Sequence, residues 1–332
     1  MAGPEISVVM SVYNEEHFIQ RAVDSILNQT YRNFEFIIIN DGSTDSTGEI
    51  LESYNDSRIH LIHQENLGLT ESLNKGIRLA KGEFIARMDG DDISRPQRLA
   101  KQVAFLDIHP DVGLLGTFVE HMDEEGQFIK TYTYPTTSDK IREVLWHDCP
   151  LCHSSVIFRK ICIDTVGVYR EKIGPAEDYD LWFRISEHFE VANIPEPLHR
   201  FRIDPYGISL SRRFHQIRSS MLVRRLARER RQLGNDSLER LNENEIRCYL
   251  EHLLPETSQN RKKVLNDNYL YIAETAYATN KFSKSLEWLF KAFWLQPLSS
   301  RACILGSKLL LASLFGEGML DRLNNIIRSR GV

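Results

Sequence analysis

The sequence FEFIII at residues 34–39, followed directly by Asn40-Asp41-Gly42-Ser43, is the segment that decides the fold. A mostly apolar, β-branched run of this length is typical of a strand that is buried on both faces. Similar runs lie before and after it, and segments with helical spacing separate them. This alternation predicts a parallel sheet flanked by helices. The predicted strands are 6–10, 34–39, 59–62 and 83–88, and the predicted helices between them are 15–27, 43–54 and 67–80.

The composition is that of an ordinary globular chain. Its 332 residues are enough for about two domains, and 42% are hydrophobic and 26% charged. These values exclude collagen-like, disordered and disulfide-scaffold classes, and the net charge of −5 gives no overall field that would recruit nucleic acid. There is no apolar run of about 18 residues, and the beginning of the sequence does not resemble a signal peptide. We therefore expect a cytoplasmic protein with reduced cysteines.

The composition changes near residue 209, beyond which Gly and Pro become rare and helical periodicity dominates. We therefore expect two domains, 1–208 and 209–332. Residues 268–297 carry small and aromatic side chains with the spacing of one tetratricopeptide unit. A single unit cannot bury its own apolar face, so we expect it to pack on neighbouring helices. The predicted fold class is an α/β domain with a mostly parallel sheet, followed by an all-α C-terminal region.

Polar and small residues follow each predicted strand of the first domain. Ligands of open parallel sheets bind outside the carboxyl ends of the strands, where such residues would gather at one edge. Any one of them is readily explained as a turn or cap residue, but four groups at one edge favour a binding site. These groups are 11–15, 40–43, 66–68 and 87–92.

The sequence Asp89-Gly90-Asp91-Asp92 is the sharpest single signal. Three carboxylates so close together repel one another unless a cation or hydrogen-bond donors compensate for their charge. Carboxylate oxygens suit Mg²⁺ and Mn²⁺, which also bind phosphates of a substrate. The alternative is a solvated acidic turn with a helix cap at Asp92.

A second acidic group, Glu177-Asp178-Tyr179-Asp180, precedes an apolar helical segment. A carboxylate among acidic neighbours holds its proton to higher pH, which suits a general base. The alternative is an N-terminal helix cap, because acidic residues are favoured by the helix dipole at that end.

The sequence resembles the family-two glycosyltransferases over about residues 5–210. The resemblance implies a GT-A (Rossmann-like) fold and an inverting enzyme that depends on a nucleotide sugar. The motifs that carry it stand in the order and at the spacing typical of that family. They are SVVMSVYNEE, FIIINDGSTDST, ENLGLTESLNKGI, FIARMDGDDISRPQRLAKQ, HSSVIFRK and AEDYDLWFRI.

The resemblance also implies roles for individual residues. Asp178 matches the catalytic base, with Glu177 beside it. Asp91 would hold Mn²⁺ or Mg²⁺, and Asp89 would bind the metal or the ribose. Asp204 stands where the family often carries a metal-site His, so it is a third candidate ligand, although a capping or loop role explains it equally well. The nucleotide sugar would lie against strand ends and loops, with Tyr13 on the base and Asp41 accepting a hydrogen bond from it. The full group is Val12, Tyr13, Glu15, Asp41, Asn66, Gly68 and Asp89.

The expected reaction is the metal-dependent transfer of one hexosyl or N-acetylhexosaminyl group from a nucleotide sugar, with UDP the usual nucleotide. The acceptor would be a hydroxyl of a glycan or lipid-linked molecule in polysaccharide, glycolipid or cell-envelope synthesis. The sequence lacks the Gln-x-x-Arg-Trp motif of processive synthases, which favours a non-processive enzyme. The alternative is a catalytically inactive, nucleotide-binding scaffold that acts through its helical tail. A nucleotidyltransferase agrees less well with the sequence. Such an enzyme would need a basic, Gly-rich loop after the first strand, whereas the turn at 13–16 is acidic.

The segment 212–232 predicts a basic amphipathic helix that is rich in arginine. Such a helix can lie on anionic lipid, which would give peripheral contact with the inner face of a membrane. The alternative is a solvated face, or pairing with the acidic residues at 239–245. Nucleic acid is not expected as a partner, because no aromatic interleaving or binding motif accompanies the arginines.

Overall fold

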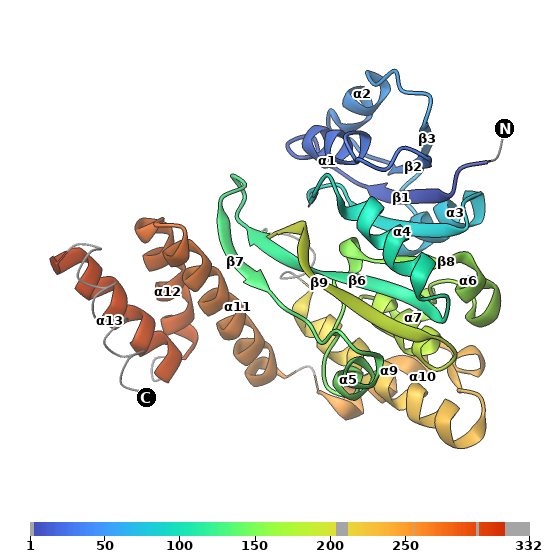
Figure 1. The fold of residues 1–332 in the computed structure, drawn as a ribbon. Coiled ribbons are helices and arrows are strands. Elements are labelled where there is room, and N and C mark those ends of the chain that lie inside the picture. Colours follow the sequence, from blue (N-terminus) through green and yellow to red (C-terminus); the bar gives the residue numbers. More distant parts are fainter. Residues whose placement is uncertain (1–2, 204–211, 256, 297–298, 316–332) are drawn as a thin grey trace. The chain divides into compact units, whose positions relative to one another are not determined.

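The computed structural model describes residues 3–203, 212–255, 257–296 and 299–315 (Figure 1). The contacts divide the chain into two units, which are described separately below. The first consists of Met1–Met122, Lys130–Ile203 and His215–Leu250. The second consists of Asp123–Ile129, Asp204–Phe214 and Glu251–Val332.

A single mixed sheet forms the centre of the α/β fold. Its strands follow the order β3-β2-β1-β4-β8-β6-β9-β5, and β7 pairs with β6. The first four run parallel to one another, as the sequence predicts, whereas β8 is antiparallel to both β4 and β6. The bounds are β1 Ile6–Val12, β2 Phe34–Asp41, β3 Ile59–Gln64, β4 Phe84–Asp89, β5 Ile93–Ser94, β6 Val112–Met122, β7 Phe128–Tyr132, β8 Ile157–Arg159 and β9 Glu190–Arg202.

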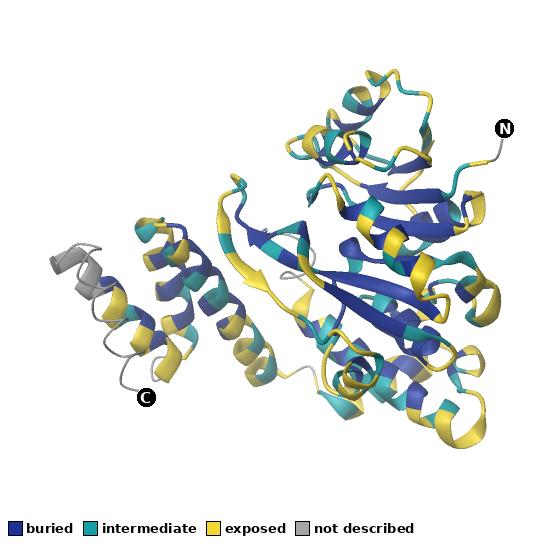
Figure 2. Cartoon of the chain, viewed as in Figure 1, coloured by how far each residue is buried: buried dark blue, intermediate teal, exposed yellow. Residues whose placement is uncertain are grey.

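Helices cover both faces of this sheet, and successive residues of a strand point to opposite faces. On β1, Val8 belongs to one apolar cluster, with Ile19 of α1 and Leu99 of α4. Val9 belongs to the other, with Leu73 of α3. The central strands β1 and β2 are therefore buried throughout, as Figure 2 shows in dark blue, whereas β7 is largely exposed. The helices are α1 Ile19–Leu27, α2 Thr47–Glu52, α3 Leu69–Leu79, α4 Arg98–Ile108, α5 Ser138–Leu145, α6 Lys160–Val166 and α7 Glu177–Ser186, with short 3₁₀ turns η1 His153–Ser155 and η2 Glu171–Ile173.

Helices α9 (Arg213–Leu233) and α10 (Glu243–Leu253) belong largely to the first unit. Leu222 and Leu226 of α9 and Ile246 of α10 join the apolar cluster that contains Trp182 of α7. The predicted boundary at 208/209 differs from this division, because the apolar face of the basic helix packs on the α/β core. The turn η3 (Leu238–Arg240) connects the two helices.

The second unit contains α11 (Ser258–Ala278), α12 (Phe282–Leu295) and α13 (Ser300–Phe315). Helices α11 and α12 pack side by side, with Ser285 Oγ donating to the Ala273 carbonyl at 2.7 Å. They share an apolar cluster that includes Leu270 and Trp288. This pair has the form expected of one tetratricopeptide unit, and that likeness remains a prediction.

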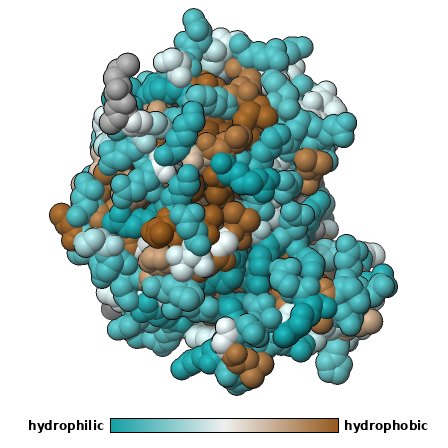
Figure 3. All heavy atoms as spheres, turned by 90° about the vertical axis from the view of Figure 1, so that its right-hand side faces the viewer, coloured by the Kyte–Doolittle hydropathy of each residue, from teal (hydrophilic) through white to brown (hydrophobic). Residues whose placement is uncertain are grey.

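No helix in the described part of the chain is long and apolar enough to cross a bilayer. On the face shown in Figure 3, polar residues surround a group of apolar ones.

Candidate active site

The carboxyl ends of β1, β2 and β4 meet at one edge of the sheet because these strands are parallel neighbours, with Ser11 paired to Asp89. The turn after β1 is tied to the turn after β2, since Asn14 Oδ1 accepts a hydrogen bond from the Thr44 amide at 2.8 Å. Asn14 has a φ of 56°, a left-handed conformation that asparagine tolerates. Next to it, Tyr13 is 47% exposed and leaves a free aromatic face at this edge.

Asp41 ends β2 and is buried, and its carboxylate organises the loop at 66–68. It accepts hydrogen bonds from the amides of Leu67 and Gly68, both at 2.9 Å, and from Gln64 Nε2 at 2.8 Å. The resemblance predicts a contact between Asp41 and the nucleotide base, whereas no local sequence pattern indicates this additional structural role. The same loop carries Asn66, which is exposed.

The acidic turn, defined as residues 89–92, crowds three carboxylates together. Ligand oxygens of Asp89, Asp91 and Asp92 lie within 4.8 Å of one another. Burial and the two neighbouring carboxylates raise the pKa of Asp91 well above its usual range. A divalent cation would relieve this repulsion, and the oxygen donors fit Mg²⁺ or Mn²⁺.

The backbone of the acidic turn needs glycine at its centre. A Cβ atom on Gly90 would lie 2.8 Å from Val12 Cγ1 and 3.3 Å from Glu15 Cγ. The turn therefore packs directly against the end of β1, which brings Val12 and Glu15 beside it.

Asp92 differs from its two acidic neighbours because its oxygens are already engaged by the protein. Its Oδ2 accepts from Ser154 Oγ at 2.5 Å and contacts His199 Nε2 at 2.8 Å, and its Oδ1 accepts from the Arg202 amide at 2.8 Å. Asp92 thus anchors β9 to the acidic turn and leaves Asp89 and Asp91 as the candidate metal ligands. Asp204, the third candidate ligand, lies outside the described residues.

The second acidic group begins α7. Burial raises the pKa of Asp178 to about 6, and burial together with Asp178 raises the pKa of Glu177 to about 8. The pair therefore holds a proton to higher pH than isolated carboxyl groups do. Asp178 Oδ1 accepts from the Tyr179 amide at 2.7 Å. The N-cap position is Ala176, which makes no side-chain cap hydrogen bond, so the acidic residues stand in the first turn of α7, where the helix dipole favours them.

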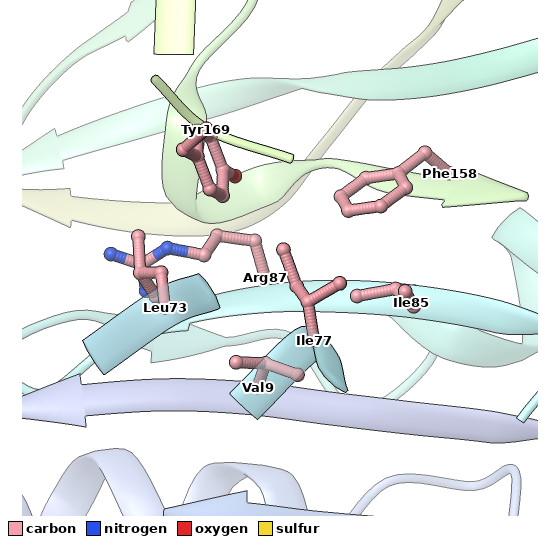
Figure 4. Close-up of a pocket in the computed structure, with 7 residues that line it drawn as sticks. All are labelled: Val9, Leu73, Ile77, Ile85, Arg87, Phe158 and Tyr169. Atoms are coloured by element: carbon pink, nitrogen blue, oxygen red, sulfur yellow. The ribbon is translucent and has the colours of Figure 1, made fainter. Parts of the chain in front are cut away.

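The acidic turn and the start of α7 act on each other electrostatically. Asp89 raises the pKa of both Glu177 and Asp178, and Arg87 lowers the pKa of both. Arg87 lies on β4 and pairs with Asp89, with 2.5 Å between Nη2 and Oδ1. Figure 4 shows the Arg87 side chain beside Leu73, with Tyr169 on the other side. The two candidate groups therefore lie close enough to influence each other's charge.

Tyr169 and His153 complete this side of the site. Tyr169 Oη lies 2.9 Å from His153 Nε2, and its backbone is held by the Asn74 side chain through two hydrogen bonds of 2.9 and 3.1 Å. Sequence reasoning missed Tyr169 and Arg87. A charged residue inside the otherwise apolar strand FIARM was the available signal for Arg87.

Several arginines of the basic helix are paired within the first unit. Arg225 pairs with Glu229, and Arg230 pairs with Glu187. Arg228 and Arg231 are exposed and line a shallow surface hollow with Trp146.

Comparison with known proteins identifies related sequences. The family described as Glycosyl transferase family 2 matches residues 7–167. The O-antigen biosynthesis glycosyltransferase WbnJ of Escherichia coli is 36% identical over 60% of this chain and 79% of its own length. The amylovoran biosynthesis glycosyltransferase AmsE of Erwinia amylovora is 30% identical over 69% of this chain and 87% of its own length.

Solved structures share the fold. S. aureus TarS, in complex with UDP-GlcNAc, superposes with a TM-score of 0.55 at 16% identity, over 88% of this chain and 92% of that chain. The mannosyltransferase PcManGT of Pyrobaculum calidifontis, in complex with GDP-Man and Mn²⁺, gives a TM-score of 0.54 at 17% identity, over 95% and 88%. These likenesses confirm the predicted GT-A fold.

Proposed function

The chain belongs to glycosyl transferase family 2 and is a glycosyltransferase, and from this premise we propose that it transfers one sugar with inversion. The donor in this proposal is a UDP-sugar, and the acceptor is a hydroxyl group. The observation that carries the proposal is the electrostatic contact between the acidic turn and the Glu177–Asp178 pair, described above. A single displacement requires a cation that would bind the departing diphosphate and a base on the opposite face of the anomeric carbon.

Asp91 and Asp89 would hold Mn²⁺ or Mg²⁺ in this proposal. The ion supplies neutralisation of the charge that develops on the departing nucleoside diphosphate. The crowded carboxylates of the acidic turn support this role, because they gain most from a bound cation.

Asp178 is the proposed general base. Its carboxylate takes the proton of the acceptor hydroxyl while the acceptor oxygen forms a bond to the anomeric carbon. The bond from that carbon to the diphosphate oxygen breaks at the same time, and its electron pair leaves with the nucleotide. An α-linked donor therefore gives a β-linked product. The raised pKa values of both members of the pair suit a base that accepts a proton near neutral pH.

The donor would lie along the strand ends. The exposed ring of Tyr13 is free to stack on the nucleotide base, and Asp41 would contact the base through an oxygen that also holds the loop at 66–68. Val12, Glu15, Asn66 and Gly68 line the same edge. The preference for uridine rests on the resemblance of the sequence motifs, since the structural neighbours contain both UDP-GlcNAc and GDP-Man.

The acceptor is proposed to be a glycan or lipid-linked molecule of polysaccharide synthesis, since two relatives are named for O-antigen and amylovoran biosynthesis. We further propose that the enzyme works at the cytoplasmic face of a membrane, with Arg228 and Arg231 beside Trp146 contacting anionic lipid. Liposome flotation tests this contact. Equal binding to anionic and neutral vesicles at low salt would argue against it.

A donor screen tests the main proposal. The purified chain is incubated with a panel of UDP- and GDP-sugars, with Mn²⁺, Mg²⁺ or EDTA, and nucleotide release is measured together with thermal stabilisation by each ligand. We expect metal-dependent release of UDP and stabilisation that follows affinity for the folded chain. Nucleotide binding without turnover of any donor and acceptor pair would favour the alternative of an inactive scaffold.

A further inference from the structure

Arg87 is a buried cation whose internal contacts are incomplete. Its side chain is 2% exposed, and a guanidinium carries five N–H donors. Nη1 donates to the Met88 carbonyl and Nη2 donates to Asp89 Oδ1, but Nε is buried without an acceptor among the described residues. A charge buried at this cost is seldom retained for stability alone, because an apolar residue of similar size is often at least as stable.

The surrounding chain holds Arg87 in one place. It lies opposite Val9 in the register of β1 and β4, and its long side chain extends along the sheet between Leu73 and Tyr169 (Figure 4). Asn74 fixes the Tyr169 backbone from the neighbouring α3. The guanidinium is therefore presented beside Asp89 rather than left free to rotate.

Three elements present four charged or titratable groups to the Glu177–Asp178 pair at the start of α7. Arg87 and Asp89 come from β4, Cys149 from the loop before η1, and Tyr169 from the loop after α6. Among these described groups, Arg87 is the positive one. Asp89 raises the pKa of Glu177 and Asp178, and Arg87 lowers it. The positive charge of Arg87 therefore offsets the repulsion between Asp89 and these two carboxylates.

We propose that Arg87 is a positioning residue that links the acidic turn to the Glu177–Asp178 pair. It holds the Asp89 carboxylate in the acidic turn, and its positive charge favours the ionised form of the pair, which can accept a proton. This inference rests on the proposed function. It predicts that loss of the charge keeps the Glu177–Asp178 pair protonated to higher pH even when the hydrogen bond to Asp89 is retained.

The experiment compares the pH profile of kcat for the full-length wild type, Arg87→Gln and Arg87→Lys. Glutamine retains an N–H donor for Asp89 but carries no charge, whereas lysine retains the charge without the guanidinium geometry. Arg98→Gln is the matched control, because Arg98 is also fully buried, contacts Arg87 through the Arg87 backbone carbonyl at 3.1 Å, and is not among the main groups that shift the pKa of Glu177 or Asp178. Circular dichroism and thermal melting establish that each variant is folded.

We expect the acidic limb of the Arg87→Gln profile to move up by about one pH unit, since an opposite charge nearby shifts a carboxyl pKa by about 1–3 units. At pH 6 this lowers kcat by about fivefold, because the ionised fraction of a base with a pKa of about 6 falls from about one half to about one tenth. Arg87→Lys should return the limb to the wild-type position, while its KM for the donor rises, and Arg98→Gln should not move the limb.

A folded Arg87→Gln enzyme with the wild-type acidic limb would overturn the inference, whatever its overall rate. If Arg87→Gln does not fold, Arg87→Lys decides, and a full-unit displacement of its limb would contradict the role given to the charge. Absence of sugar transfer by the wild type would instead refute the proposed function, so the two failures are distinguishable.

Discussion

Replacing the proposed base gives the sharpest test of the reaction. Asp178→Asn retains a side-chain oxygen that can accept from the Tyr179 amide, a contact of 2.7 Å, so the start of α7 should keep its conformation. The amide cannot accept a proton from the acceptor hydroxyl. General-base catalysis is worth about 10²–10⁴ in rate, which corresponds to about 2.7–5.4 kcal/mol in the activation free energy. We therefore expect kcat to fall at least a hundredfold.

The assay measures sugar transfer and donor binding separately. Initial rates are taken with saturating donor and metal, and donor affinity is measured by calorimetry, where Asp178→Asn should resemble the wild type. Asp164→Asn is a matched control, because Asp164 is an exposed helical aspartate on α6 and lies outside the site. Near-normal turnover of purified Asp178→Asn would refute the assignment of the base.

The remaining predictions concern the metal, pH and stability. Asp91→Asn should lower turnover at least tenfold and weaken Mn²⁺ binding measured by calorimetry; unchanged metal affinity would place the ion elsewhere. The wild-type rate should fall as pH decreases through about 6, because protonation of Asp178 removes the base; a rate that stays level down to pH 5 would contradict this. Asp180 is fully buried between Arg170 and Arg184, so Asp180→Ala should cost about 3 kcal/mol or more of unfolding free energy, measured by urea denaturation, and a loss below 1 kcal/mol would show that the network matters little.

The α/β half of the fold is readable from the sequence because its signals are local. The apolar runs at 34–39 and 83–88 and the helical spacing between them depend only on neighbouring residues, and the structure confirms the strands and the parallel order of β1 to β4. The antiparallel insertion of β8 between β4 and β6 depends on contacts between residues more than 40 positions apart. No local pattern carries that information.

The candidate site shows the same division. The acidic turn was visible as Asp89-Gly90-Asp91-Asp92, and its metal-binding role remains a prediction. The separate duty of Asp92 could not be predicted, because its partners Ser154 and His199 lie 62 and 107 residues away. The role of Arg87 likewise could not be predicted, because it depends on the interaction of β4 with Glu177 and Asp178, which are about 90 residues further along the chain.

The anchoring of Asp92 has a consequence for how the active form arises during synthesis. A nascent chain or fragment that stops at residue 167, the end of the family match, would already contain every carboxylate of the acidic turn. It would lack both His199 and the amide of Arg202, so Asp92 would lose the two partners that attach the acidic turn to β9. Catalytic competence should thus appear abruptly, once the ribosome has released the chain well past residue 202.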